Sequence, residues 1–168
     1  MSDAESERVL VVAPYGRDGE ASVHILRQSG LDAQRFDDLE KACESARAGA
    51  GALVVAEEAM ILPHFAPLAR LLDGQPPWSD LPLVVLSRER EEESASPPPR
   101  ELQRFNVTIL ERPLAVRTLV AAVQVALRAR RRQYEVRSLL EQRGALALRE
   151  KEARMRAESA SRAKDDFL

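Results

Sequence analysis

Short apolar runs alternate with helix-like segments along the first three quarters of the chain. The runs are rich in Val and Leu, a pattern typical of strands that are buried on both faces of a sheet. The pattern predicts strands near residues 8–13, 33–36, 53–56, 81–86 and 107–110. Parallel strands need crossover connections, and a helix can supply each of them here. We therefore expect an α/β fold with a five-stranded, doubly wound parallel sheet, of the flavodoxin-like kind.

The segments between the runs carry helix start and stop signals. Asp18 stands where an N-cap would precede the first helix, and Gly30 can end that helix. Residues 38–48 predict a second helix and residues 57–73 a third, which two prolines make irregular. Residues 87–100 contain four glutamates and three consecutive prolines. That stretch is predicted to be a solvated loop.

The pattern changes after Leu127. Residues 1–127 carry 13 basic and 20 acidic side chains, whereas residues 128–168 carry 12 and 7. No proline follows Leu114, and Ala, Arg, Glu and Leu favour a continuous helix. We expect a disordered start over residues 1–7, a domain over residues 8–127, and a long helix over residues 128–168 that continues the last helix of the domain.

The long helix carries a seam typical of a two-stranded coiled coil. One heptad row is apolar throughout and the other contains three charged residues, which weakens the seam and suits it to changes of register or rotation. The rows are Leu139, Leu146, Ala153, Ala160 and Phe167, and Val136, Arg143, Glu150, Ala157 and Lys164. We expect a parallel homodimer through residues 128–168. The alternative is an amphipathic helix docked on its own domain.

Composition excludes several classes of protein. The formal net charge is -2, and the single Cys43 excludes a disulfide framework or a multi-cysteine metal site. His24 and His64 have no partners at a catalytic spacing, so no metal and no cofactor is expected. No apolar run approaches the roughly 20 residues that span a bilayer, and the start lacks a signal peptide. We expect a cytoplasmic protein without membrane insertion.

A basic run at the start of the long helix raises the question of nucleic acid. Arg128, Arg130, Arg131 and Arg132 form it. No aromatic residues are interleaved and the domain before the run is acidic, so nucleic acid is not an expected partner. A solvated helix surface, or contact with a neighbouring acidic domain, is the expectation for these arginines.

One aromatic side chain also has two interpretations. Trp78 lies between Pro77 and Ser79 in a rigid loop ahead of the fourth predicted strand. A lone Trp in such a loop can anchor a partner protein. It can equally pack over the edge of its own sheet.

The carboxyl ends of the strands are where a doubly wound sheet places its chemistry. The residues there are Ala13 and Pro14, Glu57, Ser87, and Arg112 with Pro113. Through the placement of these four loops, residues 8–130 resemble the receiver domains of two-component response regulators. Met60, three residues after Glu57, matches a Met that is frequent in that family and supports Glu57 as the acceptor position.

The resemblance implies a site from which this sequence departs. A working receiver has an acidic pair for Mg²⁺ where this chain has Ala13 and Pro14, neither of which offers a side-chain oxygen. It has an aspartate that accepts phosphate where this chain has Glu57, and a Ser or Thr where this chain has Ser87. Its Lys before proline is Arg112 here, a planar fork in place of a compact ammonium. We therefore expect a pseudo-receiver without catalytic residues.

Alternatives remain open at this edge of the sheet. Glu57 and Arg112 can pair and hold the edge in one fixed state, or Glu57 can simply be the first-turn acid of the third helix, which the helix dipole favours. An atypical receiver phosphorylated at Glu57, Glu58 or Asp18 is a rival function. A passive dimerisation adaptor is the other rival.

The last nine residues carry a second resemblance. Residues 160–168 look like the segment just ahead of the phospho-accepting histidine in sensor histidine kinases, where Ala-Lys-x-x-Phe-Leu runs into the dimerisation helix. The resemblance implies a non-enzymatic N-terminal region of a longer kinase. The expected partners are a second copy of the chain and the kinase core, with another signalling protein or a response regulator as a further partner.

Overall fold

One parallel sheet organises the chain. The computed structural model describes residues 7–14, 17–60, 65–88, 102 and 104–167 of the 168 residues. Its strands run in the order β2-β1-β3-β4-β5 and all pairs are parallel, the flavodoxin-like order of a doubly wound fold. They are β1 (Val9–Val12), β2 (Ala33–Phe36), β3 (Ala52–Ala56), β4 (Leu83–Arg88) and β5 (Val107–Arg112). The predicted fold class is confirmed.

The last two strands end later than the apolar pattern predicts. β4 and β5 remain paired through Ser87↔Glu111 and Arg88↔Arg112, because the hydrogen-bonded ladder continues past the apolar residues. Ser87 is therefore inside β4 rather than after it. Arg112 is the last residue of β5, and the peptide bond to Pro113 is cis.

Helices or a helical turn follow β1, β2, β3 and β5 within the described residues, with two corrections at the helix starts. Within the described residues they are α2 (Asp18–Gln28), α3 (Leu39–Ala48), α4 (Ala66–Asp73) and α5 (Val116–Phe167), with a 3₁₀ turn η1 (Glu57–Met60). The predicted helix over residues 57–73 is wrong at its start, because Glu57–Met60 form the 3₁₀ turn η1 and α4 begins at Ala66. Pro67 lies in the first turn of α4, where its missing N–H is not needed.

The second correction concerns an N-cap. Asp38 caps α3 by accepting the Glu40 backbone N–H at 2.7 Å. Asp18 does not cap α2: Arg17 occupies the cap position without a side-chain bond, and Asp18 is the first helical residue. The carboxylate of Asp18 is bonded to Arg112 instead. Residues 61–64 lie outside the described residues, as do residues 89–100 of the loop predicted over residues 87–100, whose first two residues belong to β4 instead.

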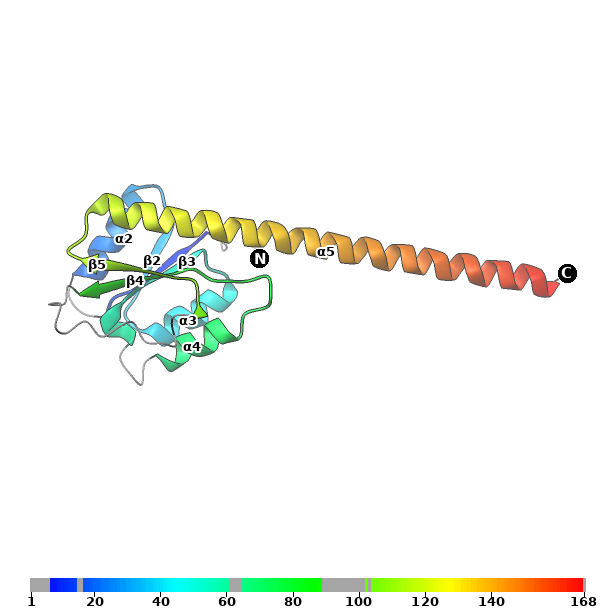
Figure 1. The fold of residues 1–168 in the computed structure, drawn as a ribbon, viewed down its shortest axis with the longest axis horizontal. Helices are drawn as coiled ribbons and strands as arrows, with labels where there is room; N and C mark the ends of the chain where they lie inside the picture. Colours follow the sequence, from blue (N-terminus) through cyan, green and yellow to red (C-terminus); the bar gives the residue numbers. More distant parts are fainter. Residues whose placement is uncertain (1–6, 15–16, 61–64, 89–101, 103, 168) are drawn as a thin grey trace. The chain divides into compact units, whose positions relative to one another are not determined.

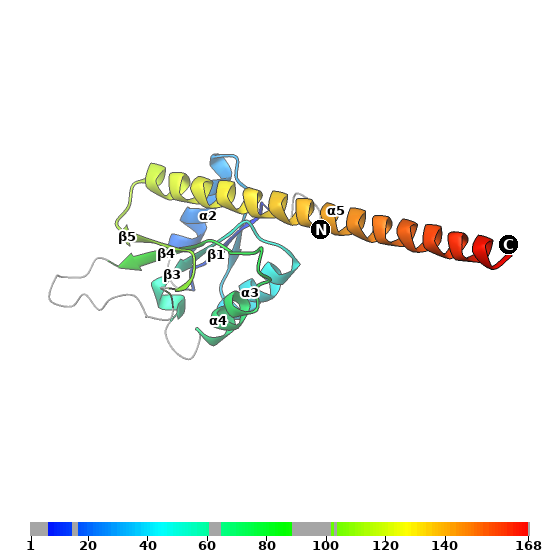
Figure 2. The same cartoon turned by 45° about the vertical axis from the view of Figure 1, so that its right-hand side comes forward.

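Helices cover both faces of the sheet (Figures 1 and 2). Alternate strand residues belong to different buried clusters. On β3, Leu53 lies in the same buried cluster as Leu68 of α4. The next residue, Val54, lies in the cluster that holds Leu26 of α2 and Val123 of α5. Two apolar cores therefore fix the sheet, and its carboxyl edge is left for polar side chains.

The chain divides into two compact units, residues 1–134 and 135–168. The sequence pattern places a boundary after Leu127, but Arg130 and Gln133 are still hydrogen-bonded to loops of the first unit. In the second unit, the apolar seam residues Val136, Leu139 and Leu146 are each about half exposed or more. Among the described helices, none is long and apolar enough to cross a bilayer.

Candidate functional site

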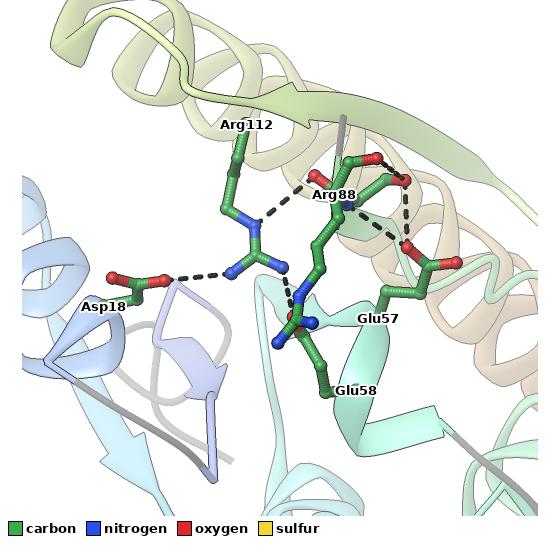
Figure 3. Close-up of polar contacts among 6 residues, drawn as sticks. Asp18, Glu57, Glu58, Arg88 and Arg112 are labelled. Atoms are coloured by element: carbon green, nitrogen blue, oxygen red, sulfur yellow. Dashed lines mark hydrogen bonds and ion pairs between the residues drawn. The ribbon is translucent and has the colours of Figure 1, made fainter. Parts of the chain in front are cut away.

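Four elements bring charged side chains together at the carboxyl edge of the sheet. Asp18 begins α2, Glu57 and Glu58 begin η1, and Arg112 ends β5 (Figure 3). Arg88 ends β4 and points toward the same place. Because the strands are parallel, their carboxyl ends meet here although the residues are far apart in sequence.

Arg112 is the centre of this cluster. Its Nη1 donates to Asp18 Oδ2 at 2.9 Å and its Nη2 donates to Glu58 Oε1 at 2.6 Å. Its Nε lies 3.4 Å from the Ser87 carbonyl oxygen. The side chains of Arg112 and Glu58 are 19% and 14% exposed, so this pair is largely shielded from water. The planar fork of an arginine suits such divided bonding, whereas an ammonium group is a single point charge.

A second arginine contacts the same carboxylate. Arg88 Nε donates to Glu58 Oε1 at 2.5 Å, so two guanidinium groups share one oxygen. The side chain of Arg88 is 70% exposed. Solvent and ions screen such a contact, so the Arg112–Glu58 pair is the stronger of the two.

The ion pairs fix the charge states of both partners. Burial alone would raise the pKa of Glu58, but bonds from its own backbone, from Arg112 and from Arg88 outweigh burial and lower that pKa below its usual value of 4.5. Burial opposes the charge of Arg112 as well, but Glu58 and Asp18 outweigh it and raise the pKa of Arg112. Both groups therefore remain ionised near neutral pH, and neither exchanges a proton there.

Glu57 is engaged by β4 rather than by Arg112. Ser87 Oγ donates to Glu57 Oε2 at 3.0 Å, and the Arg88 backbone N–H donates to the same oxygen at 3.2 Å. The alternative in which Glu57 pairs with Arg112 is therefore wrong: the guanidinium bonds Glu58, the next residue. Glu57 is also not the first-turn acid of an α-helix, because it opens the 3₁₀ turn η1.

Ala13 and Pro14 line the remaining space beside these charges. A cavity of about 170 Å³ is bounded by Ala13, Pro14, Asp18, Ala56, Glu58, Arg88 and Arg112. Neither Ala13 nor Pro14 has a side-chain oxygen, and both carboxylates in the wall are bonded to guanidinium groups. No cluster of three His, Cys, Asp or Glu residues suited to a metal ion occurs within the described ranges. The residues present do not fit the Mg²⁺ that a working receiver binds, because its ligands are absent or already paired.

The structure brings most of the predicted site residues together and adds three. Glu57, Ser87 and Arg112 lie at one edge with Ala13 and Pro14, as expected from their loops. Arg88 was missed, although a basic residue directly after Ser87 was a usable signal. The sequence favours Glu57 over Glu58 and places Asp18 at an N-cap, whereas in the structure Glu58 and Asp18 both bond Arg112.

Comparisons with known proteins agree on the architecture. No protein-family model matches the sequence, and no curated protein matches it significantly. The structure is similar to NtrX from Brucella abortus, solved in complex with ADP (TM-score 0.61, 21% identity, covering 79% of this chain and 28% of that chain). It is also similar to the receiver domain of the Francisella response regulator 1452 (0.58, 16%, covering 73% and 98%).

The receiver domain of a putative Luxo repressor protein from Vibrio parahaemolyticus gives the same result, with a TM-score of 0.61, 14% identity and coverage of 77% of this chain and 96% of that chain. The chain thus spans nearly all of two isolated receiver domains and 28% of the NtrX chain. These matches, together with the strand order, establish one conclusion. The chain has the fold of a response regulator receiver domain.

Proposed function

We propose that this chain is a regulatory pseudo-receiver of a cytoplasmic two-component sensor histidine kinase, without catalytic activity of its own. Its input is a change in packing at the domain surface, and its output passes along α5 toward a kinase core. The receiver fold and the kinase-like segment at residues 160–168 support this assignment. The inability of the carboxyl edge to hold a magnesium ion supports it as well.

The bonding of Arg112 to both Asp18 and Glu58 is the observation that carries the proposal. Transfer of a phosphoryl group to a receiver relies on a metal ion to neutralise charge and to position the phosphate. Here a guanidinium group already supplies the positive charge between the two carboxylates. The edge of the sheet is thereby held in one ionic arrangement, and phosphate chemistry has neither a metal ligand set nor an available carboxylate at Glu58.

We infer that the output requires a second copy of the chain. An isolated helix in water is marginal unless an apolar face is covered. In the second unit the side chains of Leu139, Leu146 and Phe167 are 60%, 57% and 94% exposed. A parallel coiled coil through residues 128–168 would cover this row, and the charges at Arg143, Glu150 and Lys164 would keep it weak enough to change register.

Treatment with a phosphoryl donor tests the first part. The chain is incubated with acetyl phosphate and Mg²⁺, and separately with beryllofluoride and Mg²⁺, and is followed by intact-protein mass and by amide NMR shifts. We expect no added phosphoryl group and no metal-dependent shift. A variant that restores the family's residues, with Ala13→Asp, Pro14→Asp, Glu57→Asp and Arg112→Lys, is the matched positive control. Phosphorylation of the unmodified chain would instead favour the atypical receiver.

Kinase assays test the second part. In the longer protein that carries a kinase core, Arg112→Met is compared with the unmodified chain and with a deletion of residues 8–112. We expect both changes to alter the rate of autophosphorylation, because each removes the fixed arrangement at the sheet edge. A rate unchanged in both would assign the domain the role of a passive dimerisation adaptor.

A further inference from the structure

A buried arginine holds the end of the domain opposite to the ionic site. Arg130 is 6% exposed, although the sequence pattern favours a solvated surface for its basic run. It lies in α5 and reaches two loops that precede strands of the sheet. Its Nε donates to the Ala50 carbonyl oxygen at 3.1 Å, and its Nη1 donates to Ser79 Oγ at 2.7 Å.

Two aromatic rings that contact each other lie next to this guanidinium. Its central carbon lies 4.7 Å from the centre of the Tyr134 ring and 5.6 Å from the centre of the Trp78 ring. The two rings contact each other at a centroid distance of 5.4 Å. Trp78 therefore packs against α5 of its own domain.

Gln133 of α5 makes two side-chain hydrogen bonds to the backbone of Asp80, in the loop that carries Trp78 and Ser79. Its Oε1 accepts the Asp80 N–H at 2.9 Å, and its Nε2 donates to the Asp80 carbonyl oxygen at 2.8 Å. The same Oε1 also accepts from Arg130 Nη1 at 2.6 Å. Arg130 thus orients the amide of Gln133 as well as contacting the loop directly.

The attachment of α5 changes character at Leu127. Up to that residue the buried side chains of the helix are apolar: Leu119, Val123, Ala126 and Leu127. Beyond it, Arg130 is the one buried side chain of α5. Residues 128–134 are therefore held to the domain by polar and aromatic contacts and not by an apolar core.

Such an attachment can open at low cost. The hydrogen-bond acceptors around Arg130 named above are neutral oxygens, and burial lowers the pKa of Arg130 because it disfavours the charge, with Tyr134 and Asp80 opposing. A buried charged side chain adds little net stability, because water solvates the charge well once the side chain leaves the fold. If Arg130 is replaced while the segment stays docked, by contrast, the buried oxygens that it bonds lose their hydrogen-bond donor, which is unfavourable.

We propose that Arg130 is a polar latch that docks residues 128–134 of α5 on the loop at residues 75–81, and that these turns release together when the latch opens. Residues 116–127 stay on the sheet in both states because their contacts are apolar. The latch concerns the packing of the domain itself, so its test is independent of the proposed function.

Neighbouring amides in the loop give a direct test. The Asp80 N–H is bonded to Gln133 of α5, whereas the Leu81 N–H is bonded to Gln75 Oε1 within the loop at 2.7 Å. In Arg130→Met we expect hydrogen exchange measured by NMR to accelerate about tenfold at Asp80 and at residues 128–134, while Leu81 and residues 119–126 keep their rates. Trp78 is the single tryptophan of the chain, and its quenching by acrylamide should rise in the same variant.

Arg132→Met is the matched control, because Arg132 is an exposed arginine two residues after Arg130 on the same helix. Arg130→Lys, which keeps the charge and loses the fork, should fall between the two. If Arg130→Met does not fold, Gln133→Ala carries the same test through the Asp80 amide. The latch would be overturned if the Asp80 amide exchanged in Arg130→Met, or in Gln133→Ala, at the same rate as in Arg132→Met.

Discussion

Arg112 Nη2 lies 2.6 Å from Glu58 Oε1, and this contact joins the last residue of β5 to the turn after β3. β4 lies between these two strands, so the ion pair spans the carboxyl end of a third strand. The other arm of the guanidinium reaches Asp18 at the start of α2. One side chain therefore ties three crossover units together where a working receiver would bind metal and phosphate.

Replacing Arg112 should destabilise the domain. Arg112→Met leaves Glu58 largely buried with only the exposed Arg88 beside it, and we expect a loss of about 2 kcal/mol in the free energy of unfolding. Urea unfolding followed by Trp78 fluorescence measures this loss. Arg88→Met is the matched control, with an expected loss below about 1 kcal/mol because its partner contact is solvent-exposed. Equal losses in the two variants would contradict the central role of Arg112.

The lowered pKa of Glu58 predicts a specific pH dependence. Between its folded and unfolded values the unfolded chain binds more protons at this group, so stability rises with pH in that range. The contribution of Glu58 is fully present above its ordinary pKa of 4.5 and is lost as pH falls through the lower folded pKa. The stability gap between the unmodified chain and Glu58→Gln should therefore shrink as pH falls below 4.5. A gap that stays constant across this range, measured by urea titration at each pH, would disprove the assignment.

The single cysteine should be inert in the folded chain. Cys43 lies on the buried face of α3, and burial raises the pKa of its thiol to about 11. A thiol in this state supplies almost no thiolate at pH 8, and reagent cannot reach it without opening of the fold. We expect labelling by iodoacetamide at pH 8 to be at least about a hundredfold slower than in urea-unfolded chain. Rapid labelling of the folded chain would show that the α3 face opens readily.

The fold was predictable because apolar runs report burial directly. Residues 53–56 were placed from their side chains alone, since a strand buried on both faces leaves no polar position. The end of β4 was not predictable in this way. Ser87 and Arg88 continue that strand by pairing with β5, and hydropathy does not record backbone pairing.

The site was predictable as a place but not as a set of bonds. The loops after β1, β3, β4 and β5 meet in any parallel sheet, which is why Glu57 and Arg112 could be assigned to one edge. Which of two consecutive glutamates faces Arg112 depends on the 3₁₀ turn, whose geometry the sequence does not reveal. The burial of Arg130 depends in the same way on the rotation of α5 against the loop that carries Trp78.

The proposed dimer seam can be tested with substitutions matched for exposure. Leu139→Lys and Leu146→Lys change two seam residues that are 60% and 57% exposed, and Leu140→Lys and Leu148→Lys change two residues outside the assigned rows that are 56% and 58% exposed. A charge at a core position of a coiled coil disrupts the pairing, whereas a charge on the solvated face does not. We expect the first pair of substitutions to give monomers in sedimentation equilibrium and the second pair to leave the dimer intact. Monomers in the unmodified chain, or equal behaviour of the two pairs, would refute the seam.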